Sequence, residues 1–510
     1  MPGYWKVIGR TAAALLGSVV AGCGGGGQST AELAAAPVLR VEGRVAPVGE
    51  AAPVAASVKA REATASPEPA RITLGALQSL KEAAVQAGTG PRLVGEARAV
   101  SAAATPAQTQ RLLRWEGTAT GGQVAALSVS AKNALGLRLG VQVNALPEQA
   151  VLRVYSQARP ATVYQILGED VLRHVLRNIQ AEGDTSDART WWAPEMGSDE
   201  ATLEIELPMG VPVQAVDIAL PSVSHIFAEL EPPAEPTVEA KINESGSCNL
   251  DAVCDAGLAT QSNAVARMLF TVGGKTYMCT GTLLNDARGS GTPYFLSANH
   301  CISSQAAASS MQTDWFYQSS GCNTRALSTR ATTLYNGAVL LYASGSTDVS
   351  FMRLNDAAPA GAFFAGWDAS ATAQPVQAPV VGLHHPAGDM LKISKGLVVG
   401  QTSCFSTTGN QFGCIGDTGN FYRVGWSAGT TQGGSSGSAL FTSDGRYVVG
   451  TLFGGAASCS SSSSPDYYGR FDVSYNQALK NWLGVQSTGE SSSAALITPF
   501  EEILRVLRTL

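Results

Sequence analysis

The chain has 510 residues, of which 45% are hydrophobic and 15% charged, and its net charge is −6 at neutral pH. This length allows two or three domains. The mild negative charge gives no reason to expect nucleic acid as a partner, and no apolar run after the N-terminus is long enough to cross a bilayer as a helix.

Residues 1–23 have the pattern of an export signal. Lys6 and Arg10 precede an apolar core that runs from 11 to 21. The core ends in Val-Ala-Gly-Cys23, which resembles a bacterial lipobox, in which the cysteine is lipidated. We therefore expect a lipoprotein precursor at the outer membrane or cell surface, held through Cys23. An ordinary signal peptide cut near Ala21 is the alternative.

The nine cysteines support this interpretation. Cys23 stands alone, and the other eight all follow residue 240. An even set in an exported protein predicts four disulfides and leaves Cys23 as the anchor. The eight are Cys248, Cys254, Cys279, Cys301, Cys322, Cys404, Cys414 and Cys459.

The segment 24–109 is rich in Ala, Gly, Pro and Val and predicts a low-complexity linker, with a possible short helix within 71–95. From 110 to 241, short alternating runs predict a β-rich, sandwich-like domain. One helix is expected at 168–179, with His174 on its exposed side. This part ends in an acidic, Pro-rich linker, in which Lys241 is an isolated basic residue.

The segment 242–485 is rich in Gly, Ser and Thr and contains many short apolar runs, which predicts an all-β exported domain. A spacer and a C-terminal helix are expected in 486–510. There Thr498, Pro499 and Glu501 fit the start of a helix, and an apolar stripe follows.

Three stretches of the 242–485 segment suggest nucleophilic catalysis. Ser436 lies among glycines and serines, where a sharp turn could expose its hydroxyl and aim backbone N–H groups at an oxyanion. A flexible Gly/Ser turn is the alternative. His300 precedes Cys301, whose disulfide, with Cys279 as the expected partner, would fix the loop. Asp348 opens an alternating strand and could orient the imidazole.

Other interpretations of these residues remain open. His300 could bind zinc together with Cys301, although adjacent ligands give poor metal geometry. Asp348 could be a turn carboxylate. The stretch His384-His385-Pro386 offers a second candidate base, but it lacks a disulfide anchor and is expected to be structural. The order His, Asp, Ser matches that of the chymotrypsin triad.

Eight short stretches between 245 and 485 carry a resemblance to a known family. They are Ser-Gly-Ser-Cys248 through Cys254, Cys279-Thr-Gly-Thr-Leu, Tyr294 through His300-Cys301, Leu383-His-His-Pro386, Gly434-Ser-Ser436-Gly-Ser, Gly454-Gly455, Ser458-Cys459 and Asp466-Tyr-Tyr-Gly-Arg470. The segment resembles the trypsin-like serine proteases and, within them, the bacterial lysyl endopeptidases.

The resemblance implies a chymotrypsin-like double β-barrel with its active site between the barrels. It implies that His300 is the general base, Asp348 its orienter and Ser436 the nucleophile. The backbone N–H groups of Gly434 and Ser436 would form the oxyanion hole. The implied disulfides are Cys248–Cys459, Cys254–Cys322 and Cys279–Cys301, which leaves Cys404 and Cys414 as a pair outside the family pattern.

Specificity is expected to come from Asp466. In trypsin, an aspartate six residues before the nucleophile binds the basic side chain, and Thr430 occupies that position here. Lysyl endopeptidases use an aspartate in the stretch matched by Asp466, which implies cleavage after basic residues, with Lys favoured. A surface-loop carboxylate is the alternative for Asp466. Phe453, next to Gly454 in the substrate-lining strand, replaces a family histidine. The family tryptophan has no clear match near Cys404 and Cys414.

Ser435 also departs from trypsin, in which an aspartate before the nucleophile pairs with a freed N-terminus. Activation by that ion pair is therefore excluded. We expect the region 24–241 to act as a propeptide, a folding aid or a cover over the cleft. Self-cleavage after Lys241 would leave Ile242 as the new N-terminus and would release the protease from its anchor into the extracellular space.

The expected partners are protein or peptide substrates, the chain's own propeptide and, through the lipid, a membrane. No metal or organic cofactor is required, and a monomer is expected. Two alternatives remain: a protease with another cleavage preference, and a non-catalytic, lipid-anchored binding protein with a degenerate protease fold.

Overall fold

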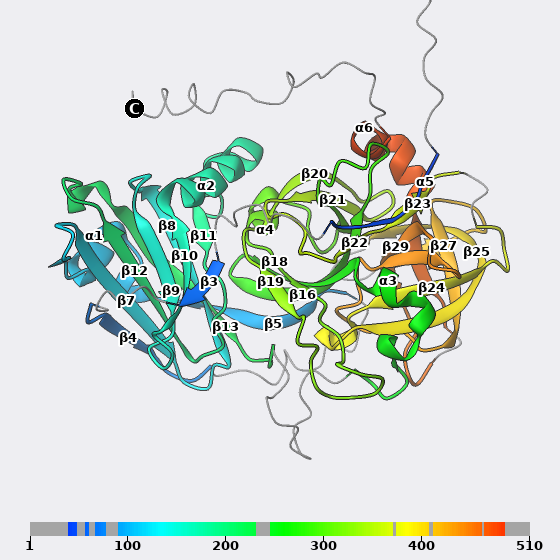
Figure 1. The fold of residues 1–510 in the computed structure, drawn as a ribbon, viewed down its shortest axis with the longest axis horizontal. Coiled ribbons are helices and arrows are strands. Elements are labelled where there is room, and N and C mark those ends of the chain that lie inside the picture. Colours follow the sequence, from blue (N-terminus) through cyan, green and yellow to red (C-terminus); the bar gives the residue numbers. More distant parts are fainter. Residues whose placement is uncertain are drawn as a thin grey trace, which may run out of the picture. The chain divides into compact units, whose positions relative to one another are not determined.

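The computed structural model describes residues 39–47, 57–60, 67–77, 90–230, 245–370, 374–406, 412–461 and 464–484 (Figure 1). Cys23, Lys241 and the helix expected within 486–510 lie outside the described residues. Within them, no helix combines the length and apolar character needed to cross a membrane.

The N-terminal domain consists of two β-sheets packed around one core. Its strands are β3 (Ser57–Ala60), β4 (Ala70–Leu74), β5 (Arg92–Ala99), β6 (Glu116–Gly117), β7 (Gln123–Ala131), β8 (Gly136–Ala145), β9 (Val151–Tyr155), β10 (Thr162–Leu167), β11 (Thr190–Trp192), β12 (Glu200–Leu207) and β13 (Asp217–Ile226). One sheet has the order β3-β10-β9-β12-β7-β4, and the other contains β11-β8-β13-β5. Buried apolar side chains from both sheets form the core, as the sandwich prediction expects.

Two helices accompany these sheets, α1 (Pro106–Leu112) and α2 (Gly168–Glu182). Helix α2 confirms the helix expected at 168–179 and buries Val171 and Val175. The exposed position expected for His174 is wrong, because only 6% of this residue is exposed. His174 lies three residues after Val171, and this spacing places both on the same helix face.

The linker expected over 24–109 also differs from the structure. Strands β3, β4 and β5 and the start of helix α1 lie within it. Residues 71–74 and 92–95 of the range expected to contain a short helix are strand, and residues 78–89 of that range lie outside the described residues. The strands depend on distant partners: β4 pairs in parallel with β7, and β5 pairs with β13. Local composition does not reveal such pairings, because strand formation depends on the neighbouring strands.

The second domain contains the remaining strands. They are β14 (Leu250–Asp251), β15 (Val265–Val272), β16 (Lys275–Leu284), β17 (Tyr294–Ala298), β18 (Gln312–Trp315), β19 (Thr332–Leu334), β20 (Ala338–Ser344), β21 (Val349–Leu354), β22 (Phe363–Phe364), β23 (Gly366–Asp368), β24 (Pro379–His384), β25 (Lys392–Ser406), β26 (Phe412–Ile415), β27 (Phe421–Ala428), β28 (Ala439–Thr442), β29 (Tyr447–Gly455) and β30 (Asp466–Arg470). Strands β1 (Arg40–Val41) and β2 (Arg44–Val45) pair with β23 and β22.

These strands form two barrels, as the double-barrel prediction requires. In the first, β18, β15, β16, β17, β21 and β20 pair in succession. In the second, the pairings run from β29 through β28, β24, β25, β27 and β30, and β30 pairs back to β29. Each barrel has its own apolar cluster, and a third cluster lies between them.

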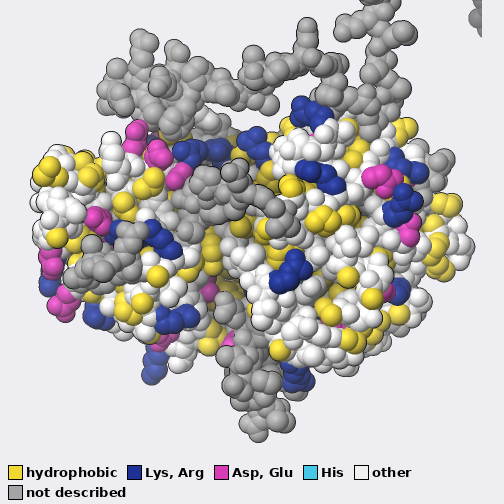
Figure 2. Space-filling model, viewed as in Figure 1, with side chains coloured by type: hydrophobic (Ala, Val, Ile, Leu, Met, Phe, Trp, Pro, Cys, Tyr) yellow, Lys and Arg dark blue, Asp and Glu magenta, His cyan; other side chains and the backbone are white. Residues whose placement is uncertain are grey.

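Short helices complete this domain. They are α3 (Ala259–Ser262), α4 (Gln305–Ser309), α5 (Phe471–Ser474), a π-helical turn (Tyr475–Leu479) and α6 (Lys480–Leu483). Four disulfides join Cys248 to Cys459, Cys254 to Cys322, Cys279 to Cys301 and Cys404 to Cys414. The pairs are those expected from the sequence. On the face in Figure 2, basic side chains are scattered rather than gathered into one patch.

One sheet is shared by the two domains. Strand β5 lies between β13 of the N-terminal domain and β16 of the first barrel, so that an 11-stranded sheet runs through both. Arg138 strengthens this junction: its guanidinium donates to Thr271 Oγ1 at 2.8 Å and to the Ser310 carbonyl at 2.6 Å. Burial lowers the pKa of Arg138 to about 10.

Candidate active site

Ser436 lies on the turn between β27 and β28, in the second barrel. It is 2% exposed, and two glycines with positive φ flank it, Gly434 at +97° and Gly437 at +81°. A Cβ on Gly437 would lie 2.2 Å from Ser297 Oγ. Glycine is therefore required there both by backbone conformation and by space.

The first barrel holds this turn through Thr280 on β16. The Thr280 N–H donates to the Ser436 carbonyl at 2.9 Å, and its hydroxyl donates to the Gly434 carbonyl at 2.9 Å. From the second barrel, the Ala387 N–H donates to the Gly433 carbonyl at 2.7 Å. Three carbonyl groups of the turn are thus held by hydrogen bonds.

His300 and Asp348, which lie 48 residues apart in sequence, are joined by two hydrogen bonds. The imidazole Nδ1 lies 2.6 Å from Asp348 Oδ2, and the His300 N–H donates to Oδ1 at 3.0 Å. Asp348 is buried, and burial raises the pKa of its carboxyl group although His300 opposes this shift. Its φ of +51° is strained for a non-glycine residue, and such strain clusters at functional sites.

The other imidazole nitrogen of His300 is available for chemistry. Among the described residues, His300 Nε2 is buried and has no hydrogen-bond partner. The loop of His300 is linked to the serine turn by a disulfide and a hydrogen bond: Cys301 is bonded to Cys279, and the neighbouring Thr280 donates to the Ser436 carbonyl. The structure thus brings the surroundings of His300 and Ser436 together at the junction of the barrels.

Aromatic rings pack beside His300. The Phe453 ring centroid is 5.8 Å from that of His300, and the Phe412 ring packs against Phe453 in a tilted arrangement, with the centroids 4.3 Å apart. The sequence identified Phe453 but not Phe412. The disulfide between Cys404 and Cys414 closes the hairpin that carries Phe412. This cysteine pair is the sequence feature that could have drawn attention to Phe412.

Asp466 is enclosed at the start of β30. Its Oδ2 accepts hydrogen bonds of 2.7 Å from Trp426 Nε1 and from the Thr431 hydroxyl. Its Oδ1 is buried and has no hydrogen-bond partner among the described residues, and the same holds for the Thr430 hydroxyl. Burial raises the pKa of Asp466, although Trp426, Thr431 and the backbone N–H of Ala457 oppose this shift. A cation beside Oδ1 would oppose it further.

Gly434 makes a contact that the sequence did not reveal. Its N–H donates to the carbonyl oxygen of Gly90, in the N-terminal domain, at 3.0 Å. Nearby, the Arg92 guanidinium donates to the Ala387 carbonyl, in the turn that also holds Gly433. The N-terminal domain therefore reaches the backbone donors expected to form an oxyanion hole.

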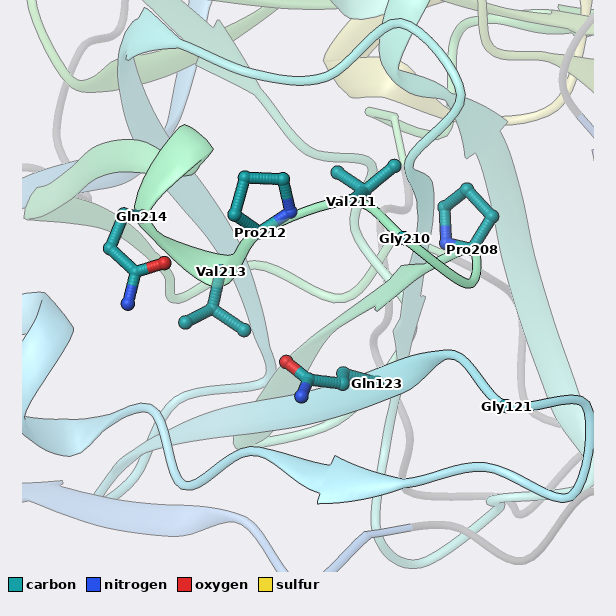
Figure 3. Close-up of a pocket in the computed structure, with 8 residues that line it drawn as sticks. All are labelled: Gly121, Gln123, Pro208, Gly210, Val211, Pro212, Val213 and Gln214. Carbon is teal, nitrogen blue, oxygen red and sulfur yellow. The ribbon is translucent and has the colours of Figure 1, made fainter.

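A cavity of about 370 Å³ lies elsewhere, in the N-terminal domain (Figure 3). Gln123 and Gln214 supply side-chain polar groups, and the rest of the lining is Gly, Pro and Val. It contains none of the site residues expected from the sequence, and it offers no ionisable or nucleophilic side chain.

Family comparisons cover both domains. Residues 242–469 match the model described as "Lysyl endopeptidase, C-terminal domain", and residues 65–227 match that described as "Lysyl endopeptidase N-terminal domain". The chain is 33% identical over 397 residues to a lysyl endopeptidase of Pseudomonas aeruginosa. The aligned part covers 73% of this chain and 78% of that protein.

Solved structures are more distant. The MamO protease domain of Magnetospirillum magneticum is 12% identical, with a TM-score of 0.30. Its alignment covers 45% of this chain and 99% of the MamO domain. A protease of M. tuberculosis in its active form is 14% identical, with a TM-score of 0.31, and covers 50% of this chain and 96% of its own. Both family models and the curated relative place this chain in the lysyl endopeptidase family, among the trypsin-like serine endopeptidases.

Proposed function

We propose that the protein is an exported endopeptidase that cleaves after lysine through Ser436, His300 and Asp348. The observation that carries this proposal is the hydrogen bond between His300 and the buried Asp348, beside the Ser436 turn, which leaves Nε2 of His300 without a partner among the described residues. Activation of a nucleophile needs a base with one nitrogen held by an orienting group and the other able to accept a proton.

The reaction follows from the roles of these groups. Ser436 Oγ attacks the carbonyl carbon of the scissile bond while His300 Nε2 takes the hydroxyl proton. The N–H groups of Gly434 and Ser436 stabilise the oxyanion. His300 then protonates the leaving amine, and the acyl-enzyme is released by water that His300 deprotonates. Asp348 holds the Nδ1 proton and stabilises the imidazolium.

Asp466 supports the preference for lysine. Two donors hold one carboxylate oxygen, and the other oxygen has no hydrogen-bond partner within the described part of the chain. A substrate ammonium group beside Oδ1 would pair this buried charge, whereas a neutral side chain would leave it unpaired. The hydroxyl of Thr430 offers a further acceptor.

A panel of peptides tests the activity and its specificity together. Matched peptides carry Lys, Arg, Glu or Leu before the cut, and kcat/KM is measured on the processed protein. We expect Lys to exceed Glu and Leu by about 10³-fold or more, as an unpaired buried charge implies. Equal rates would overturn the specificity. Absence of fluorophosphonate labelling at Ser436 would overturn the catalytic assignment.

The precursor state is also part of the proposal. We expect the N-terminal domain to be a propeptide that covers the site, supported by the hydrogen bond from Gly434 to Gly90 and by the pairing of β5 with β16. Cleavage after Lys241 would separate the domains, and lipidation at Cys23 would hold the precursor at the cell surface until then.

N-terminal sequencing tests the maturation step. We expect secreted wild-type protein to begin at Ile242 and the Ser436→Ala chain to remain whole. A wild-type chain without this cut, or an equally processed Ser436→Ala chain, would overturn self-maturation. Incorporation of labelled palmitate, compared between wild type and Cys23→Ser, tests the anchor.

A further inference from the structure

His384, at the end of β24, is fully enclosed and contacts the residue that precedes Ser436. Its Nδ1 is 2.9 Å from Ser435 Oγ, and its Nε2 is 2.9 Å from Ser394 Oγ. Both serines are also buried. The imidazole therefore bridges two hydroxyl groups inside the second barrel.

The direction of each hydrogen bond follows from the outer partners. Ser394 Oγ donates to the Thr430 carbonyl at 2.9 Å, so it accepts from His384, which places the imidazole proton on Nε2. Nδ1 is then an acceptor, and the Ser435 hydroxyl donates to it. Ser435 Oγ in turn accepts from the Gln432 N–H at 3.2 Å.

These hydrogen bonds form a series that links the two ends of the segment before Ser436. It begins at the Thr430 carbonyl, passes through Ser394 and His384 to Ser435, and ends at the Gln432 N–H. The segment from 430 to 435 thus has both ends tied to one imidazole. That segment contains Thr431, which donates to Asp466, and it ends at the residue that precedes the proposed nucleophile.

We propose that His384 is the positioning residue that holds the Ser436 turn in its working conformation, in the uncut chain and the processed one alike. The proposal rests on the function proposed above. Each link joins neutral groups already buried in the precursor, so the turn needs no new N-terminus to become ordered. Cleavage then acts by removing the N-terminal domain.

Two substitutions at His384 separate its two hydrogen bonds. An Asn side chain places an amide oxygen near the position of Nδ1, and His384→Asn thus keeps an acceptor for Ser435. A Gln side chain reaches the position of Nε2, so His384→Gln keeps the link to Ser394 and loses that to Ser435. His385→Gln is the matched control, because this equally buried histidine bonds the Asp389 carbonyl rather than the turn.

Each full-length chain is treated with a trace of wild-type protein, so that slow variants are still processed, and kcat, KM and Tm are measured. We expect His384→Gln and Ser435→Ala to lower kcat by about 100-fold, the cost of misplacing a reacting group by about 1 Å, with KM changed less than about threefold. His384→Asn should retain most of kcat. The double variant His384→Gln, Ser435→Ala should be no worse than either single one.

The outcomes are distinguishable. A kcat for His384→Gln that equals that of His385→Gln at similar Tm would overturn the positioning role, and so would equal losses in His384→Asn and His384→Gln. Additive losses in the double variant would also overturn it. If the wild-type protein itself is not labelled by fluorophosphonate, the proposed function fails instead. Should His384→Gln not fold, the Ser435→Ala measurement decides.

Discussion

The carbonyl oxygen of Gly90 accepts a 3.0 Å hydrogen bond from the N–H of Gly434. In a serine endopeptidase, that N–H is a candidate donor to the oxyanion, and one donor of this kind contributes about 10²–10³-fold to turnover. The N-terminal domain therefore occupies a backbone group that the proposed reaction needs. The residue after Gly90 is Pro91, which has no N–H.

Arg92 should determine how firmly this contact holds. Its guanidinium donates to the Ala387 carbonyl, and hydrogen bonds of charged groups contribute about 1.5–3 kcal/mol. We expect Arg92→Ala to raise the dissociation constant of the processed N-terminal domain about tenfold or more. Activity measured across a dilution series of processed protein gives this constant.

Arg98→Ala is the control for that experiment. Arg98 lies on the same strand, but it donates to the Gly75 carbonyl within its own domain. Its replacement should leave the midpoint of the dilution curve unchanged. Equal shifts in both variants would contradict a role for the Arg92 contact.

Asp348→Asn should lower kcat by about 10⁴-fold with little change in KM. The Asn amide would donate to Nδ1, so the imidazole proton would move to Nε2, which then could not accept the Ser436 proton. Steady-state kinetics on a lysyl substrate measures the loss. Because Asp348 is buried with a raised pKa, its replacement can also change stability, and Tm is therefore measured alongside. A variant with full activity would contradict the assignment.

Asp466→Asn should abolish the preference for lysine rather than the chemistry. We expect kcat/KM for a Lys peptide to fall about 10³-fold, in line with the 2–5 kcal/mol or more lost when one member of a buried charge pair is removed. The rate for a Leu peptide should fall far less. A parallel fall for both peptides would indicate a structural role for Asp466.

The pH dependence gives a second test of the same carboxylate. Burial raises the pKa of Asp466 in the free enzyme, so its negative charge is lost at a higher pH than an ordinary aspartate would lose it. As the pH falls, kcat/KM for the Lys peptide should therefore decline before that for the Leu peptide. Asp466→Asn should remove the difference between the two profiles.

Buried histidines should destabilise the fold in mild acid. Burial lowers the pKa values of His174, His384 and His385 to about 3, whereas unfolded histidine titrates near 6.5. Below about pH 6.5 the unfolded chain binds more protons than the folded one, so the free energy of unfolding falls as pH drops.

Thermal unfolding of the full-length Ser436→Ala chain between pH 7 and 5 measures this effect without self-digestion. We expect Tm to decrease towards pH 5. Adding His385→Gln should flatten the decrease, because one of the three buried groups no longer titrates. An unchanged slope in that variant would contradict the neutral, buried state of His385.

The sequence was most informative where residues near in sequence carry the chemistry. His300 beside Cys301, Asp348 at the start of a strand and Ser436 between glycines each have a local pattern, and the structure places His300 against Asp348. The family resemblance implied the two barrels and three of the disulfides, and it left Cys404 and Cys414 as the fourth pair. The resemblance, rather than periodicity, indicated which distant motifs belong together.

Contacts between distant, featureless segments could not be predicted. Nothing in the composition around Gly90 indicates that its carbonyl oxygen would meet Gly434, and strand β5 was placed in a linker because its pairing partners lie far along the chain. His384 was expected to be structural because it lacks a disulfide anchor, and nothing in the sequence indicated its hydrogen bond to Ser435. Side-chain hydrogen bonds of this kind depend on tertiary packing.

The disulfide between Cys248 and Cys459 spans 211 residues, and this span sets an order of events during synthesis. Cys248 cannot form this bond until nearly the whole protease domain has been made. The N-terminal domain is complete by Ile226 and, as the earlier product of translation, can fold first. Its strand β5 is then ready to receive β16 as that strand emerges, long before the last bond can close.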